Sequence, residues 1–182
     1  ERTPYEADVY INQLCHYCCD REYAIARRTH EYLLHNPTWP TEWILDSVLI
    51  AWNDFLYTAD PTSLNHYYED LKAKTLVSLA REDGLITLEN LTEDILDAIH
   101  FNGPSRDFFK HPIRDIVDWP RSERDGFDDR PVNAVVNAFH FRALVLMSRI
   151  AEVVGKRADA AQFTRRSRNV LHSFRRRLID ST

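Results

Sequence analysis

Glycine is scarce in this sequence, with only four residues among 182. Tight turns between strands often need glycine, so its scarcity argues against a sheet-rich fold and favours helices. No uninterrupted apolar run reaches about 18 residues, the length of a membrane-spanning helix. Positive charge is not in excess either, because the net charge is −5, which argues against a general nucleic-acid binder. We therefore predict no membrane and no nucleic-acid partner.

Cysteine is limited to three residues, Cys15, Cys18 and Cys19, all within one predicted helix. Zinc sites usually need a second pair of ligands at a suitable spacing, and none is apparent near CHYCC. We predict buried thiols in a helix core, no metal and no cofactor. An odd, local set of cysteines builds no disulfide framework, so the compartment stays open, with periplasm and secretion among the alternatives.

The composition that is present is typical of one packed helical domain. Hydrophobic residues make up 44% of the chain, charged residues 28% and aromatic residues 12%. A chain of this length buries a sizeable core. The abrupt start and the end directly after a helix predict a piece of something longer.

Three segments are apolar nearly all round except for one narrow polar stripe. They are predicted as helices at residues 5–19, 42–58 and 132–154. Buried polar groups are costly unless paired, so we expect each stripe to face a wet cavity. The stripes are Asp8, Asn12 and His16; Asp46, Asn53 and Asp54; and Asn133, Asn137 and His140.

Each of these segments is followed by an ordinary amphipathic helix, predicted at residues 21–35, 62–81 and 158–179. In the first of them Ile25, Tyr32 and Leu33 are expected on the buried face and His30 on the outer face. Alternating buried and outer helices predict three helical hairpins, half of an α/α toroid of the six-hairpin type. An α-solenoid is the rival fold, but no repeat of fixed period is visible.

Residues 82–131 lack any long periodic element apart from one short helix near 92–99, with Thr92 as its N-cap. A long irregular segment inside a compact domain is usually functional or disordered. This segment has too many aromatic residues for disorder, so we predict a functional loop insertion.

Carboxylates mixed with tryptophans gather where the inner helices are expected to meet this loop. Aromatic rings stack on sugar C–H faces, and a pair of carboxyls can serve as acid and base, so the pattern indicates a sugar site. The rim candidates are Glu1, Tyr5, Glu6, Asp8, Glu42, Trp43, Asp46, Asp118, Trp119, Glu123, Arg124, Asp125, Asp128 and Asp129.

The opening stretch, ERTPYEAD, resembles part of a motif of bacterial α-L-rhamnosidases, glycoside hydrolase family 78, whose fold is a six-hairpin toroid. That motif reads roughly D-x-P-x-R-(D/E)-E-R-x-G-W-T-G-D. By this resemblance Glu1 stands for the general acid, Tyr5 for the tryptophan and Asp8 for the sugar-binding aspartate. The departures are Pro4, Glu6 and Ala7, where the family has Gly, Thr and Gly, and the upstream aspartate would precede Glu1.

Two further stretches carry the same resemblance. EWILDSVLIAWNDFLYTAD is similar to a family helix in which Trp43 would be an aromatic subsite. IVDWP is similar to a GDW segment, which makes Asp118 and Trp119 candidates for the substrate pocket. The stretch that begins at Glu123 and Arg124 resembles the part of the family that follows, so both residues are further candidates.

The resemblance implies inverting hydrolysis of terminal α-L-rhamnosides, with a carbohydrate as partner. Glu1 would protonate the glycosidic oxygen, and a second glutamate, expected past Thr182, would activate water; Glu6 or Glu123 would replace it only in a divergent branch. Residues 1–182 would then be part of one catalytic domain, inactive alone and closed by the rest of the parent chain or a second copy. The alternatives are a non-catalytic helical module that binds carbohydrate or protein, and another toroid enzyme acting on acidic sugars, for which Arg106, Arg114, Arg121, Arg124 and Arg130 would be suited.

Overall fold

The computed structural model describes residues 4–117, 121–123, 126 and 130–179. These residues are mainly helical, and in place of strands they show only two isolated bridges, Pro40 with Arg114 and Ala80 with Ile86. The predicted all-α class is therefore confirmed.

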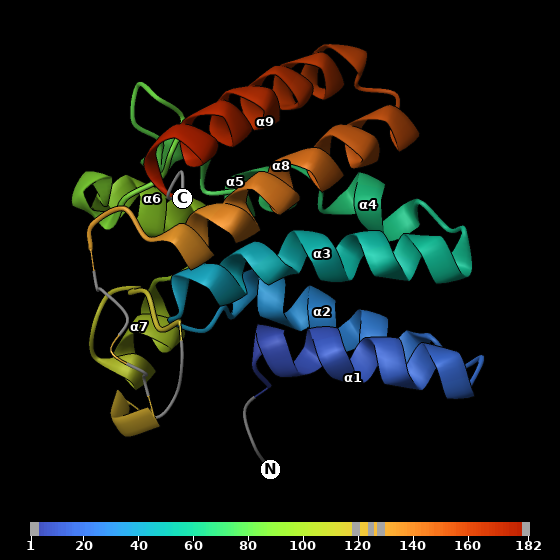
Figure 1. The fold of residues 1–182 in the computed structure, drawn as a ribbon. Helices are drawn as coiled ribbons and strands as arrows, with labels where there is room; N and C mark the ends of the chain where they lie inside the picture. Colours follow the sequence, from blue (N-terminus) through green and yellow to red (C-terminus); the bar gives the residue numbers. More distant parts are fainter. Residues whose placement is uncertain (1–3, 118–120, 124–125, 127–129, 180–182) are drawn as a thin grey trace.

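Three helices form an inner row: α1 (Glu6–Cys19), α3 (Thr41–Thr58) and α8 (Ala134–Val153). All three begin at the same end of the molecule, on the left of Figure 1, and α3 packs between the other two. By length and composition α8 could cross a membrane, but it packs against α3 and α9 as a core helix does.

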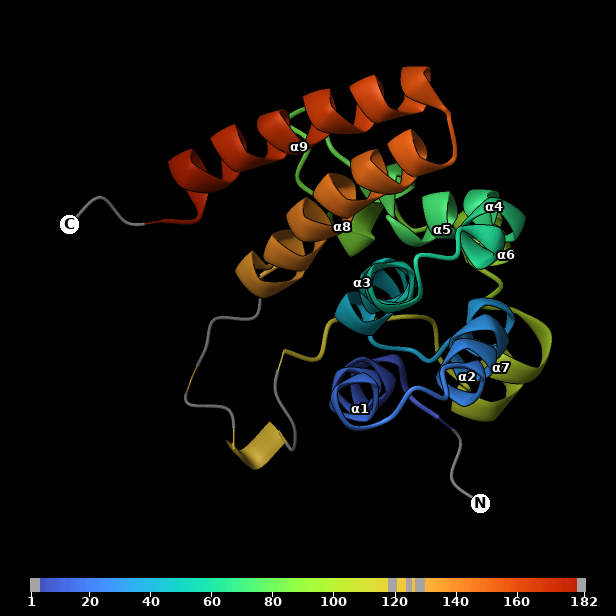
Figure 2. The same ribbon diagram turned by 90° about the vertical axis from the view of Figure 1, so that its right-hand side faces the viewer.

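An outer row covers these helices. It consists of α2 (Ala24–His35), the short helices α4 (Thr62–His66) and α5 (Tyr68–Lys74), and α9 (Arg157–Arg177). Figure 2 shows α9 over α8, and α2, α4 and α5 beside α3. The predicted alternation of inner and outer helices is present. Gly155, at φ +78°, lies in the turn between α8 and α9, where Lys156 N–H donates to the Ala151 carbonyl.

The second outer helix is not the continuous helix that we predicted over residues 62–81. Tyr67 leaves the helical region between α4 and α5, and Leu76 adopts a left-handed conformation before a 3-10 turn (Val77–Leu79). Leu64, Tyr68 and Leu79 are nevertheless all buried. Both α4 and α5 pack against α3.

The long segment after this turn holds two short helices, α6 (Glu93–Ala98) and α7 (Gly103–Phe109). The N-cap prediction is confirmed, because Thr92 Oγ1 accepts a hydrogen bond from Ile95 N–H. Helix α7 was not predicted; its Pro104 lies in the first turn. Proline suits that position because the first helical N–H groups have no partner inside the helix.

Two predicted faces are wrong. In α2, Ile25 is 70% exposed while His30 is buried. In α1, Ile11 is 61% exposed and all three cysteines are exposed, not buried. The buried face of α1 instead carries the polar residues Glu6, Gln13 and Tyr17, which have partners inside the protein.

The buried face of α1 is joined to α3 by hydrogen bonds. Gln13 Nε2 donates to the Ile50 carbonyl at 3.2 Å, and Tyr17 Oη donates to Asp54 Oδ1 at 2.7 Å. Arg27 from α2 completes the group, with Nε 2.9 Å from Asp54 Oδ2. Pairing lowers the cost of burying these polar side chains, although Gln13 Oε1 has no hydrogen-bond partner among the described residues.

The polar stripe of α8 was predicted to face a wet cavity, but its residues are bonded within the protein. Asn133 caps its own helix by accepting from Val135 N–H at 2.8 Å. Asn137 bonds both the N–H and the carbonyl of Ile86, and His140 Nδ1 lies 2.8 Å from the Thr75 carbonyl. The stripe therefore fixes the loop after α5 onto the inner row.

Candidate functional site

Two predicted sugar-stacking residues meet where α1 and α3 begin. The rings of Tyr5 and Trp43 are in edge-to-face contact, with centroids 5.5 Å apart. The ring centroid of Phe109, from α7, lies 6.5 Å from that of Tyr5. Edge-to-face pairs are a favoured aromatic geometry, and both Tyr5 and Trp43 stay partly exposed. The contact of Phe109 with Tyr5 was not predicted from the sequence.

Glu42, in the first turn of α3, binds the backbone at the start of the IVDWP stretch. Its carboxylate accepts hydrogen bonds from Ile116 N–H at 3.2 Å and from Val117 N–H at 2.5 Å. The start of α3 adds a further bond, from Thr41 N–H to the Arg114 carbonyl. Val117 is held at φ +59°, a left-handed conformation that bulky residues seldom adopt. Strained residues of this kind persist where the surroundings over-determine them, often at functional sites.

Two more carboxyl groups lie behind this rim. Glu6 is fully buried and accepts hydrogen bonds from both the N–H and the hydroxyl of Thr38. Asp46, one turn after Glu42, is 3% exposed, and its Oδ1 has no hydrogen-bond partner among the described residues. Burial, and then the charges of Glu6 and Glu42, raise the pKa of Asp46 to about 8. Asp46 is therefore mainly protonated at neutral pH.

Burial also raises the pKa of Glu6 and Glu42, although hydrogen bonds oppose the shift. Lys74 is fully buried and interacts with Glu6. Burial lowers the pKa of Lys74 to about 8, and the charge of Glu6 opposes that shift. Glu6 is thus a structural acceptor for Thr38. Nothing in its geometry supports the open alternative that it acts as the catalytic base.

The remaining predicted site residues fall into two groups. Asp8 is exposed in the first turn of α1, and Glu123 is exposed at the end of a 3-10 turn (Arg121–Glu123). Glu1, Asp118, Trp119 and Arg124 lie outside the described residues. The structure thus brings together Tyr5, Trp43 and, through Glu42, the backbone that directly precedes Asp118.

Glu42 was a rim candidate as a carboxylate, but its role as an anchor for residues 116–117 was missed. Only the acidic type and the place at a helix start were visible in the sequence. Its partners are two backbone N–H groups more than seventy residues away in the chain. A backbone donor carries no residue-type signal, so no motif could have revealed the pairing.

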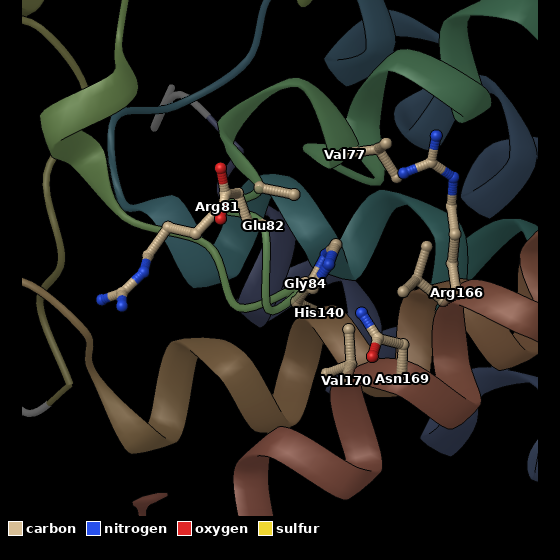
Figure 3. A pocket seen from close by; sticks show the side chains of 10 residues that line it. Val77, Arg81, Glu82, Gly84, His140, Arg166, Asn169 and Val170 are labelled. Atoms are coloured by element: carbon tan, nitrogen blue, oxygen red, sulfur yellow. The ribbon is translucent and has the colours of Figure 1, made fainter.

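A separate cleft lies between residues 77–84, α8 and α9. Its empty space, about 360 Å³, is open to solvent. Figure 3 shows His140 near Gly84, with Arg81 and Arg166 on opposite sides. Burial lowers the pKa of His140 to about 4, so its imidazole is neutral. Glu82 also lines the cleft, but none of the predicted site residues does.

An inner row of helices that begin at one rim, with aromatic and carboxyl groups there, defines an α/α-hairpin domain with a polar rim site. The family model of the bacterial alpha-L-rhamnosidase six-hairpin glycosidase domain matches residues 1–182. The chain therefore belongs to this family, and the resemblance seen in its motifs is confirmed. No curated protein matches the chain.

Proposed function

We propose that this chain is part of an inverting glycoside hydrolase domain that cleaves terminal α-L-rhamnosides. Membership of a glycosidase family supports the reaction class. The observation that carries the proposal is the convergence at one rim of Tyr5, Trp43 and the Glu42-anchored loop. These three features come from separate parts of the chain, and each belongs to a stretch that resembles the rhamnosidases.

The proposed chemistry uses the two carboxyls of an inverting glycosidase. Glu1 donates a proton to the glycosidic oxygen, and a second carboxylate, not assigned to a residue of this chain, activates water on the opposite face of the sugar. Tyr5, Trp43 and Trp119 offer ring surfaces to the C–H face of the sugar. Asp8 accepts hydrogen bonds from sugar hydroxyls.

Further roles follow from position. Asp118 directly follows Val117, whose N–H is held by Glu42, so Glu42 is a positioning residue for this part of the pocket. Glu123 and Arg124 are further polar contacts for the substrate. Because reacting groups must be held close to a productive geometry, loss of the Glu42 anchor is expected to weaken catalysis without removing a reacting group.

The alternative of an enzyme for acidic sugars relied on five arginines, and two of them have other partners in the structure. Arg106 forms an ion pair with Glu93, and Arg114 lies over the Trp39 ring at 4.5 Å from the centroid. Both guanidinium groups already have partners within the chain. A neutral deoxy sugar such as rhamnose needs no such cation.

The test uses the complete protein and an aryl α-L-rhamnoside. Glu1→Gln should abolish release of the phenol while the circular dichroism spectrum and Tm stay unchanged. Glu152→Gln, at an exposed position on α8, serves as the matched control and should keep full activity. Proton NMR of the first product should show the β-anomer of rhamnose, as inversion requires.

Undiminished turnover by Glu1→Gln would reject the acid assignment. Release of the α-anomer first would reject inversion while leaving a glycosidase in place. Parallel aryl uronides separate the acidic-sugar alternative, which predicts turnover of those substrates. A non-catalytic module would bind sugar but turn over none of them.

A further inference from the structure

Three side chains that can bind metal meet on the far side of α3 from α8. They are His35 at the end of α2, Asp70 on α5, and His100 after α6. Their candidate ligand atoms all lie within 4.8 Å of one another. His100 Nε2 is 2.7 Å from Asp70 Oδ1, and the two imidazole centroids are 4.6 Å apart. Figure 2 shows α2, α5 and α6 grouped on one side of α3.

We propose that His35, Asp70 and His100 form a binding site for a divalent transition-metal ion of the zinc type. Two imidazole nitrogens and one carboxylate oxygen are a ligand set of open zinc sites, in which water takes the fourth position. With metal–ligand bonds of about 2.1 Å, tetrahedral ligands lie about 3.4 Å apart. In the structure His100 Nε2 and Asp70 Oδ1 are 2.7 Å apart and all three atoms lie within 4.8 Å of one another, so metal binding would require side-chain rotations that bring them to about 3.4 Å.

The backbone at His100 is held in a conformation that it would not choose by itself. His100 has φ +59°, in the turn that ends α6, where glycine is the usual residue. Its N–H donates to the Asp97 carbonyl, and Phe101 N–H donates to the Leu96 carbonyl. Backbone strain at a residue whose side chain can bind or react often reflects a functional constraint. Here the turn directs the imidazole toward Asp70.

A buried lysine joins the two elements that carry Asp70 and His100. Lys74 Nζ donates to the Ile99 carbonyl at 2.6 Å, one residue before His100. Lys74 also lies one turn after Asp70 on α5, so both project from the same side of that helix. Phe101, which follows His100, is fully buried. Rigid support of this kind is what a metal site needs, because it holds the ligands before the ion arrives.

The site is open to an ion from solvent. The His100 and Asp70 side chains are 35% and 24% exposed, which leaves room for entry and for a bound water. Tyr67 packs on His35 with ring centroids 5.7 Å apart. Burial raises the pKa of Tyr67, and the charges of Glu31 and Asp70 add to the shift, so two carboxylates act on this region. The buried ammonium of Lys74, which interacts with Asp70, opposes them.

The simpler alternative is an ion pair between protonated His100 and Asp70, with no metal. The two models differ in His35. An ion pair does not need it, whereas a three-ligand site loses a ligand without it. A non-local triad also explains why spacing within the sequence gave no sign of a metal: the ligands are at least 30 residues apart.

The test is a calorimetric titration of the chelator-treated protein with Zn²⁺ alone. The background carries Cys15→Ser, Cys18→Ser and Cys19→Ser, because exposed thiols bind zinc themselves. We expect one ion per chain, with affinity reduced at least about tenfold by His35→Ala and by His100→Gly. His66→Ala is the matched control, since His66 is exposed and contacts Tyr67 but lies outside the triad.

His100→Gly separates binding from folding. Glycine relieves the left-handed strain, so this variant should have an equal or higher Tm without zinc, yet lose the rise in Tm that zinc gives the parent. Ca²⁺, which prefers oxygen ligands, should produce no such rise. Absence of zinc binding, or binding that His35→Ala and His100→Gly leave unchanged, would overturn the proposal. Rhamnoside turnover is a separate readout, so either proposal can fail without the other.

Discussion

Helix α3 is held on its two sides by different kinds of contact. The side that meets α8 belongs to one large apolar cluster that also includes α5 and α9. The side that meets α1 has a small apolar cluster of Val9, Leu33 and Ile50 and relies on buried hydrogen bonds. The comparison teaches that an inner helix can be fixed by polar groups as well as by apolar packing, and that only the apolar side is plain in the sequence.

The largest effect is expected on the apolar side. Leu144→Ala, in α8, should lower the free energy of unfolding by about 3 to 5 kcal/mol, because it leaves a cavity in a fully buried position. Urea unfolding measures the change. Val135→Ala, at a 38% exposed position of the same helix, should cost less than about 1 kcal/mol. A loss below 1 kcal/mol for Leu144→Ala would mean that this face is loosely packed.

On the polar side, Asp54→Ala should cost about 3 kcal/mol, because it leaves Tyr17 and the partly buried Arg27 without their acceptor. Asp60→Ala removes the other carboxylate of Arg27, but its side chain is 40% exposed. It should therefore cost less than Asp54→Ala. Equal losses in the two variants, measured by thermal unfolding, would show that burial does not govern the strength of this group.

Asp46 connects the stability of α3 with pH. Its pKa in the folded state, about 8, is raised above the unfolded value near 3.8, so its contribution to stability is complete below about pH 3.8 and is lost as the pH rises through 8. Asp46→Asn cannot ionise and should remove this slope, which is at most about 1.4 kcal/mol per pH unit. The difference in free energy of unfolding between variant and parent should therefore grow from pH 5 to pH 8.

Exposed Asp94 is the matched control for that series. Asp94→Asn should shift the free energy of unfolding by a similar small amount at each pH. If the difference in free energy of unfolding between parent and Asp46→Asn stayed constant from pH 5 to pH 8, Asp46 would be ionised in the folded state across that range.

The smallest effect separates the two faces of α1. Gln13→Ala should cost about 1 kcal/mol, because the Ile50 carbonyl and Tyr17 hydroxyl lose a buried partner. Asn12→Ala, next to it on the exposed face, should change stability by less than about 0.5 kcal/mol. A larger loss for Asn12→Ala than for Gln13→Ala would indicate that Asn12, and not Gln13, lies on the inner face of α1.

Much of the architecture was predictable because long periodic segments report helices directly. The inner helices and the alternation with outer ones follow from their apolar patterns. The face of α2 was not predictable, since His30 is buried and Ile25 exposed against their usual preferences. The break near Tyr67 was also hidden, because the apolar residues of α4 and α5 keep a common face across it.

Some features of the candidate site were predictable from the sequence and others were not. Tyr5 and Trp43 were predictable from residue type and from resemblance, and their contact follows from the packing of α1 on α3. The hydrogen bonds from Ile116 and Val117 to Glu42, and the meeting of His35 with His100, were not. They join segments far apart in the chain through groups that leave no local pattern.

The sequence by itself determined the helical class, the order of inner and outer helices and the residue types at the rim, because these depend on local periodicity and on motifs. Only the tertiary structure decided which polar groups are paired, which carboxyl stays protonated and which distant histidines meet. The physical reason is that burial and hydrogen bonding depend on what lies opposite each side chain, and that partner is set by packing between elements.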